Sequence, residues 1–313
     1  MKYYFAPMEG ITGYIFRNAH HACFGGIEKY YTPFITSKAG KGLSTREKND
    51  ILPENNPGIN LVPQILSNQA EGFLAIAERL ENLGYQEVNL NLGCPSGTVV
   101  PKKKGAGFLA EPEMLDRFLE EIFEKCPLPI SIKTRIGMYD PEEFDRLLEI
   151  YNRYPVCELT VHARTREEFY RGTVHMEAFA KALKESKCPV CYNGDLFSKN
   201  KIREFAQQFP EAQVCMIGRG LLIDPALATG RDLTREDLKT FHERLISDYL
   251  TVLAPQDTMF KMKELSSWFT RLFPDEEKAK KQIRKAQNLT EYKAAVNQML
   301  SSGRMEAVEK FVY

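Results

Sequence analysis

The sequence has no apolar run approaching the roughly 20 residues that a membrane-spanning helix needs. It begins with a strand-like segment rather than a signal peptide. It also has no net charge, because 42 Lys and Arg residues balance 42 Asp and Glu residues, so any argument for nucleic-acid binding must be local. Its seven cysteines are an odd number, which indicates reduced thiols rather than a disulfide framework. These absences predict a cytoplasmic protein with no membrane segment.

Metal-binding patterns are equally scarce. Cys188 and Cys191 form a Cys-x-x-Cys pair, but no second pair and no histidine cluster accompanies it. We therefore interpret both as small side chains on a buried strand and predict no metal site. The apolar fraction of 43% is sufficient for a sizeable core, which argues against a disordered chain.

Short apolar segments alternate with amphipathic helical patterns, such as the one over residues 69–83. Their near-continuous hydrophobicity is typical of parallel strands that are buried on both faces. The eight segments begin at Tyr3, Glu28, Asn60, Gln86, Pro129, Cys157, Pro189 and Gln213. Eight strands with intervening helices over roughly 225 residues predict an α/β fold, a (β/α)8 TIM barrel. The stretch 35–59 reads as a loop rather than as a crossover helix.

After Asp224 and Pro225 the strand-like segments stop. Helical patterns cover residues 237–253, 258–272, 276–286 and 289–301. We therefore predict a TIM barrel in residues 1–230, followed by a small C-terminal helical domain in residues 231–313.

Polar or unusual groups follow nearly every predicted strand. In TIM barrels the active-site groups lie at the carboxyl ends of the strands, so these residues should converge on one concave site. They are Ala6, Pro7, Met8, Gln64, Asn91, Cys94, Lys133, Arg135, His162, Arg164, Asn193, Gly194, Asp195, Gly218 and Arg219.

Two features of this set indicate a flavin. Gly194, Gly218 and Arg219 follow the seventh and eighth strands, where such barrels often bind a phosphate through backbone N–H groups. Lys133 lies inside an otherwise apolar strand, and a buried lysine needs an anion or an electron-rich ring beside it. A flavin offers such a region around N1 and the C2 carbonyl.

Cys94 lies between Gly93 and Pro95, just past a strand. An unperturbed thiol has a pKa of ~8.5 and is mostly protonated at neutral pH, so Cys94 is suited to act as an acid. It is equally suited to act as a nucleophile if His162 ionises it. The residues alone leave both alternatives open.

These residues resemble the tRNA-dihydrouridine synthase family. The matching segments are APMEGIT from Ala6, PQIL from Pro63, NLGCPS from Asn91, GAGFLAEPEML from Gly105, SIKTRIG from Ser131, TVHART from Thr160, YNGD from Tyr192 and CMIGRG from Cys215. The resemblance implies an FMN-bound barrel that is reduced by NADPH, and a helical domain that grips tRNA together with the barrel. It implies no stable protein partner.

The resemblance also implies a role for each matching position. Cys94 would protonate C5 of uridine and Asn91 would read the uracil edge, while Arg135, His162 or Arg164 would stabilise the developing enolate. The flavin contacts would be Ala6, Pro7, Met8, Gln64, Lys133 and His162. The phosphate end would be held by Asn193, Gly194, Asp195, Gly218 and Arg219. At Thr98 the chain departs from the family, in which many members have a lysine.

Two groups of basic residues are candidates for tRNA contact. Lys102, Lys103 and Lys104 lie on the cysteine loop, and residues 261–285, which include Lys261 and Lys263, hold eight basic residues against four acidic ones. Such a local excess favours a phosphate backbone as partner, although a solvated helix face is the alternative.

Three other functions are compatible with parts of this pattern. The first is an FMN barrel that reduces a small molecule, which would not need the basic helical tail. The second is an RNA-binding protein without redox activity, which would bind no flavin. The third is a Cys94–His162 hydrolase, which alkylation of the thiol would inactivate. The choice between NADPH and NADH, and the uridine that is modified, cannot be read from the sequence.

Overall fold

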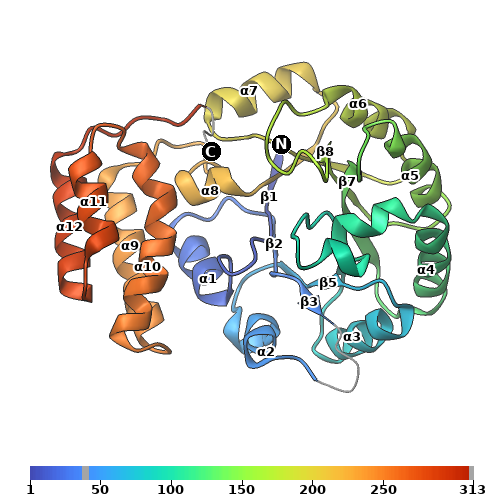
Figure 1. Ribbon diagram of the computed structural model, residues 1–313, viewed down its shortest axis with the longest axis horizontal. Helices are drawn as coiled ribbons and strands as arrows, with labels where there is room; N and C mark the ends of the chain where they lie inside the picture. The colour runs from blue at the N-terminus through green and yellow to red at the C-terminus, as the bar shows by residue number, and fades with distance from the viewer. Residues whose placement is uncertain (37–41, 310–313) are drawn as a thin grey trace.

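The computed structural model describes residues 1–36 and 42–309, and it contains a ten-stranded parallel sheet that curls around a buried centre (Figure 1). The strand order is β3-β5-β6-β7-β8-β9-β10-β1-β2-β4. The strands are β1 (Lys2–Phe5), β2 (Lys29–Tyr31), β3 (Ile35–Thr36), β4 (Leu61–Val62), β5 (Gln64–Leu66), β6 (Val88–Leu92), β7 (Ile130–Gly137), β8 (Leu159–Thr165), β9 (Val190–Asn193) and β10 (Val214–Ile217).

The predicted strand that begins at Asn60 is broken in two, and the one that begins at Glu28 is followed by the short strand β3, which lies in the stretch predicted as loop. Pro33 separates β2 from β3 and Pro63 separates β4 from β5; proline has no N–H to donate to a sheet ladder. Because β2 pairs with β4 and β3 pairs with β5, the broken strands join the two ends of the sheet. The prediction of an α/β TIM barrel is confirmed.

Helices surround the strands, as Figure 1 shows. They are α1 (Tyr14–Cys23), α2 (Thr45–Ile51), α3 (Ala70–Asn82), α4 (Pro112–Lys125), α5 (Glu143–Tyr151), α6 (Met176–Glu185), α7 (Lys199–Gln208) and α8 (Arg219–Ile223). The predicted helix over 69–83 is α3. The interpretation of residues 35–59 as loop is wrong, because α2 lies within it. The missed signal is a capping box, in which the side chains of Ser44 and Glu47 each bind the other's backbone N–H.

The C-terminal helices α9 (Arg235–Leu250), α10 (Pro255–Phe269), α11 (Glu277–Lys285) and α12 (Leu289–Ser302) gather beside α1 on the left of Figure 1. All four agree with the helical patterns of the sequence. The Phe241 ring of α9 packs edge-on against Phe16 and Phe24, with ring centroids 5.6 and 5.2 Å apart. A division into two domains near residue 230 stays a prediction. Within residues 1–36 and 42–309, no helix is both long and apolar enough to cross a membrane.

Candidate active site

The predicted strand-end residues surround one cavity of about 410 Å³. Predicted residues that line it are Ala6, Pro7, Met8, Gln64, Asn91, Cys94, Lys133, Arg135, His162, Asn193, Gly194, Gly218 and Arg219. Arg164 and Asp195 do not belong to the described lining. Sequence reasoning missed other lining residues, among them Glu9, Pro33 and Tyr170.

Asn91 shapes the turn that carries Cys94. Its Oδ1 accepts hydrogen bonds from the backbone N–H groups of Gly93 and Cys94, at 3.1 and 3.0 Å. Its Nδ2 donates to Oε1 of Gln64 at 2.6 Å. The Asn91 amide therefore fixes the Cys94 backbone and ties it to the neighbouring strand, while it also faces the cavity.

The segment around Gly105 supports the same turn from behind. The N–H of Ala106 donates to the Cys94 carbonyl oxygen at 3.1 Å. Gly105 has a φ of +55°. A Cβ at this position would lie 2.9 Å from the carbonyl oxygen of Cys94 and 3.0 Å from the Cβ of Cys94. Only glycine fits this close approach, which explains why the GAGF segment accompanies the cysteine in the sequence.

The electrostatic surroundings keep Cys94 protonated. Burial raises the pKa of the Cys94 thiol, and the cations of Arg135 and Lys133 only partly oppose this effect. Burial, followed by the same two cations, lowers the pKa of His162 well below its ordinary value, so the imidazole is neutral. No hydrogen bond joins Cys94 to His162 in the part of the chain that the structure describes. The geometry favours a thiol acid over an ionised nucleophile.

Lys133 points into the cavity beside Asn193. Its Nζ donates to Oδ1 of Asn193 at 2.8 Å, and Nδ2 of Asn193 donates to the Met216 carbonyl oxygen at 2.8 Å. Burial, with a smaller contribution from Arg135, lowers the pKa of Lys133 to about 8. The amine is therefore still largely protonated at neutral pH, and it lacks a carboxylate partner among its described contacts. This is the environment expected for a lysine that meets an electron-rich ligand.

Arg135 links the cysteine turn to β8. Its Nε donates to the Gly93 carbonyl oxygen at 2.9 Å and its Nη1 donates to the Thr165 carbonyl oxygen at 2.8 Å. The guanidinium carbon lies 5.2 Å from the centre of the Tyr170 ring, which also stacks on His162 with centroids 5.9 Å apart. Tyr170 thus covers cavity groups from two strands. Its position shortly after the TVHART segment is the feature of the sequence that could have marked it as a lining residue.

Asp195 and Arg164 occupy different places from those expected. The Asp195 carboxylate accepts from Nη1 and Nη2 of Arg164, at 3.0 and 2.5 Å, and from Nη2 of Arg219 at 2.8 Å. Arg164 is fully buried, and it also donates to the carbonyl oxygens of Arg171 and Gly172. Asp195 thus connects Arg164 to Arg219, and Arg164 in turn holds the loop that carries Tyr170. The expected contacts of Asp195 with the cofactor and of Arg164 with the substrate stay predictions.

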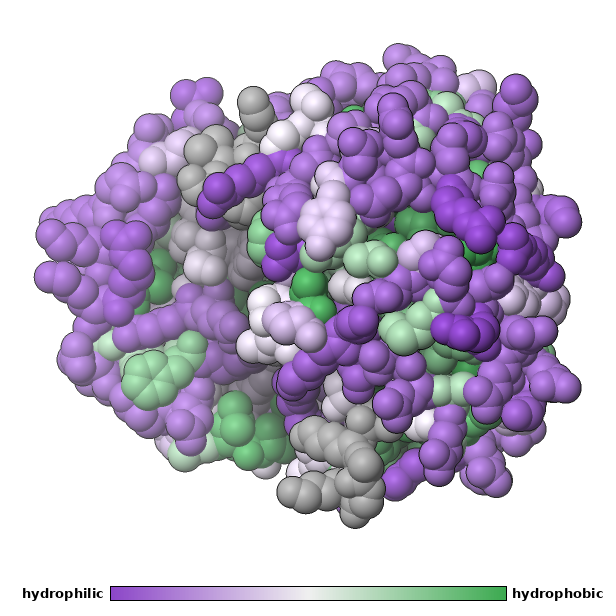
Figure 2. All heavy atoms as spheres, turned by 45° about the vertical axis from the view of Figure 1, so that its right-hand side comes forward, coloured by the Kyte–Doolittle hydropathy of each residue, from purple (hydrophilic) through white to green (hydrophobic). Residues whose placement is uncertain are grey.

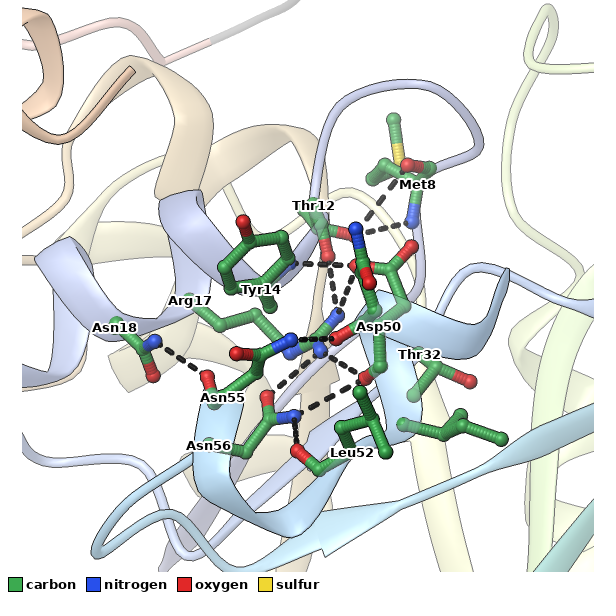
Figure 3. Close-up of polar contacts among 12 residues, drawn as sticks. Met8, Thr12, Tyr14, Arg17, Asn18, Thr32, Asp50, Leu52, Asn55 and Asn56 are labelled. Carbon is green, nitrogen blue, oxygen red and sulfur yellow. Dashed lines mark hydrogen bonds and ion pairs between the residues drawn. The ribbon is translucent and has the colours of Figure 1, made fainter. Parts of the chain in front are cut away.

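The loop between β1 and α1 forms another wall, and Figure 3 shows how it is held. The Met8 N–H donates to Oγ1 of Thr12 at 2.8 Å. The buried Arg17 donates from Nη1 to the Thr12 carbonyl oxygen, and from Nη2 to the Asp50 carbonyl oxygen and to Oδ1 of Asn56, at 2.7, 2.7 and 2.8 Å. One arginine thereby ties the Met8 loop to the α2 region.

The predicted tRNA-contacting lysines lie outside the cavity. Lys103 pairs with Glu111 at 2.6 Å, and neither it nor Lys102 or Lys104 belongs to the described cavity lining. All three stand on the segment that supports Cys94.

Lys261 and Lys263 on α10 have structural partners. The Nζ of Lys261 donates to the Gly10 carbonyl oxygen, which links α10 to the β1–α1 loop. The Nζ of Lys263 donates to the carbonyl oxygens of Arg284 and Ala286, at 3.1 and 2.5 Å, and so caps the C-terminus of α11. Lys263 is less available to RNA than the sequence suggested.

The fold is that of a TIM-barrel enzyme, and its strand-end cavity brings the half-buried Lys133 and the Cys94 thiol together. The chain belongs to the family described as Dihydrouridine synthase (Dus), whose model matches residues 4–311. The family resemblance read from the sequence is confirmed.

Curated relatives agree with this assignment. The chain is 28% identical over 293 residues to the "tRNA-dihydrouridine(16) synthase" of Pseudomonas putida, in a match that covers 88% of this chain and 90% of the relative. It is 28% identical over 229 residues to the "Probable tRNA-dihydrouridine synthase" of Staphylococcus epidermidis, covering 70% of this chain and 68% of the relative. Among solved structures, morphinone reductase matches with a TM-score of 0.52 at 12% identity, covering 77% of this chain and 88% of that chain, which shows a shared fold.

Proposed function

We propose that this enzyme reduces the C5–C6 double bond of specific uridines in tRNA to dihydrouridine in the cytoplasm, with FMN reduced by NADPH and with Cys94 as the proton donor. The observation that carries the proposal is the geometry of the cysteine turn: Asn91 and Gly105 hold Cys94 in the lining of the same cavity as Lys133. Family membership and the names of the relatives support the substrate.

The cavity residues fit FMN. A volume of about 410 Å³ lies within the range of roughly 300–1,000 Å³ that small-molecule sites occupy. Lys133 and Gln64 would meet the polar edge of the ring. Gly194 and Gly218 line the cavity next to Arg219, and at Gly194 only glycine fits because a Cβ would lie 2.0 Å from the Tyr192 hydroxyl. Arg219, oriented by Asp195, would supply the phosphate's positive partner.

Bound FMN, once reduced by the nicotinamide, would supply the hydride that reaches C6 of the uracil. Cys94 would then give its proton to C5, and the resulting thiolate would regain a proton from solvent. The raised pKa of Cys94 keeps the proton in place until C5 becomes basic enough to accept it. The uridine thus gains one hydride and one proton.

Negative charge develops on the C4 carbonyl oxygen before C5 is protonated. Arg135 is the best-placed group to stabilise it, because it is buried, positively charged and fixed to both Gly93 and Thr165. The neutral His162 would contribute a hydrogen bond rather than a charge. Asn91 lines the cavity and retains a second Nδ2–H, so we propose that it contacts the uracil edge.

The tRNA would lie across the barrel mouth and the C-terminal helices. Lys102 and Lys104 next to the cysteine turn, and Lys261 at the junction with α10, are basic groups close to this path. The match to the Pseudomonas putida relative covers 88% of this chain, so it reaches into the helical segment, and that relative is named for position 16. We propose uridine 16 as the position that this enzyme modifies.

The test maps dihydrouridine in tRNA from cells that lack the protein, and then restores wild type, Cys94→Ala or Cys126→Ala. Cys126 is a half-buried thiol outside the cavity and serves as the matched control. We expect one lost position, restored by wild type and by Cys126→Ala but not by Cys94→Ala. An unchanged map in the deletion strain, or full restoration by Cys94→Ala, would contradict the proposal.

A second assay separates the proposal from the alternatives left open by the sequence. Purified protein reconstituted with FMN is supplied with NADPH and either tRNA or free uridine. Turnover only with tRNA supports the proposal. Equal turnover with free pyrimidines would indicate a small-molecule reductase, and failure to bind FMN would indicate an RNA-binding protein without redox activity.

A further inference from the structure

A second cavity of about 350 Å³ lies beside the active site. Its walls come from the β1–α1 loop and the start of α1, from α2, from the end of α9 and the segment after it, and from Lys261 in the middle of α10. Pro33 lines both cavities, and Glu9 of the first is followed by Gly10 of the second. The β1–α1 loop is therefore a thin partition, with Met8 facing one cavity and Tyr14 the other, and Figure 3 shows both residues on this loop and its continuation into α1.

The second cavity combines apolar walls with unused hydroxyl groups. Val252 and Leu253, just after α9, are 53% and 36% exposed, and Figure 2 shows apolar patches within an otherwise mainly hydrophilic surface. The Tyr14 and Tyr249 side chains both line the cavity. Neither hydroxyl has a hydrogen-bond partner among the residues that the structure describes. Two hydroxyls over an apolar floor suit a flat ligand with polar edges.

Cations line the same cavity. Arg46 pairs with Glu9 at 2.6 Å, and Lys261 pairs with Glu264 at 2.7 Å while also contacting Gly10. The Arg46 side chain is 55% exposed, so its ion pair is weak and exchanges readily with another anion. The cavity thus offers stacking surface, hydrogen-bonding groups and a positive charge within one enclosure.

We propose that this cavity is a second nucleoside subsite, which holds an unpaired base of the tRNA close in sequence to the uridine under reduction. The inference rests on the proposed function. A polynucleotide that delivers one base to Cys94 must pass over the partition, and the next unstacked base then meets Tyr14 and Tyr249. Apolar and aromatic surfaces stack any base, and hydroxyl groups read its edge. Arg46 takes the phosphate between the two nucleotides.

The first test fills the cavity. Leu253→Trp places an indole within it. Leu250→Trp is a matched control, because Leu250 is 39% exposed at the end of α9, three residues earlier, but does not belong to the cavity lining. We expect Leu253→Trp to raise KM for tRNA about tenfold, the effect of losing one stacked base. Flavin content and NADPH oxidation should match wild type in both variants.

The second test identifies the base and needs no bulky substitution. Abasic sites are introduced one at a time within three nucleotides of the target uridine, and each RNA is assayed with wild type, Leu253→Trp and Tyr249→Phe. At one position the abasic site should raise the KM of the wild-type enzyme for the RNA about tenfold. The KM of Leu253→Trp, already raised, should not rise further with that RNA. Tyr249→Phe keeps the ring and removes only the hydroxyl, so it should show a smaller loss of coupling at that position.

The outcomes separate this inference from the proposed function. If wild type reduces tRNA, but Leu253→Trp behaves like Leu250→Trp and no abasic position is coupled to it, the second subsite is refuted and the proposed function stands. If wild type does not reduce tRNA at all, the proposed function fails, and the subsite falls with it.

Discussion

Replacing Gly105 by alanine isolates the contact that holds the Cys94 turn. Gly105 has a φ of +55°, a conformation that costs an alanine roughly 1–2 kcal/mol. In addition, the new Cβ would lie 2.9 Å from the Cys94 oxygen and 3.1 Å from Cγ1 of Val99, closer than ordinary contacts of 3.4–4 Å. Such overpacking costs about 1–3 kcal/mol more unless the Cys94 turn moves.

The matched control is Gly84→Ala. Gly84 has a φ of +87°, but no atom lies within 4 Å of the place that a Cβ would take, so only the backbone cost applies. We expect urea unfolding to show a loss of roughly 1–2 kcal/mol for Gly84→Ala and a larger loss for Gly105→Ala. The difference between the two variants measures the contact with Cys94.

The same pair of variants tests catalysis. A shift of a few tenths of an ångström in Cys94 should slow protonation of uridine about tenfold, since a misplacement of about 1 Å costs roughly 100-fold. Stopped-flow mixing of the reduced enzyme with tRNA measures that step, and mixing of the oxidised enzyme with NADPH measures a step that needs no thiol. Gly105→Ala should slow only the first, and Gly84→Ala neither. If Gly105→Ala has wild-type rates and unfolds like Gly84→Ala, the contact does not position Cys94.

Two further predictions concern the cofactor. Because an electron-rich ring favours the lysine cation, FMN binding should raise the pKa of Lys133 from about 8. The affinity for FMN should therefore stay level below that pH and fall as the pH rises through it. Fluorescence titrations should show this fall for wild type but not for Lys133→Met, and a level wild-type profile would refute the contact. Because the Asp195 carboxylate orients Arg219, Asp195→Asn should lower the preference for FMN over riboflavin about tenfold; an unchanged ratio of the two dissociation constants would mean that Asp195 has no positioning role.

The sequence was sufficient to predict the barrel and most of the residues that line the cavity. The carboxyl ends of parallel strands meet at one edge of a barrel whatever path the connecting segments take. It was insufficient where side chains interact with one another rather than with the ligand. Asp195 and Arg164 follow strands like the true lining residues, and only the folded structure shows that they satisfy each other. Likewise, nothing in the sequence indicates that Lys263 caps α11, and its predicted contact with RNA stays a prediction. Tyr170 reaches the cavity from a loop, whose path no periodicity predicts.

The barrel is weakly closed at the joint formed by β2–β5, where Pro33 and Pro63 interrupt the strands. Strands β7 and β8 run for eight and seven residues, whereas β3 and β4 have two each, so the ring is thinly hydrogen-bonded where its ends meet. Segments with few ladder bonds open locally at low free energy while the rest of a domain stays folded. Gln64 and Pro33 lie at this joint, and Pro33 borders both cavities. We therefore expect the barrel to open locally at this joint, and a ligand in either cavity to stabilise the closed ring.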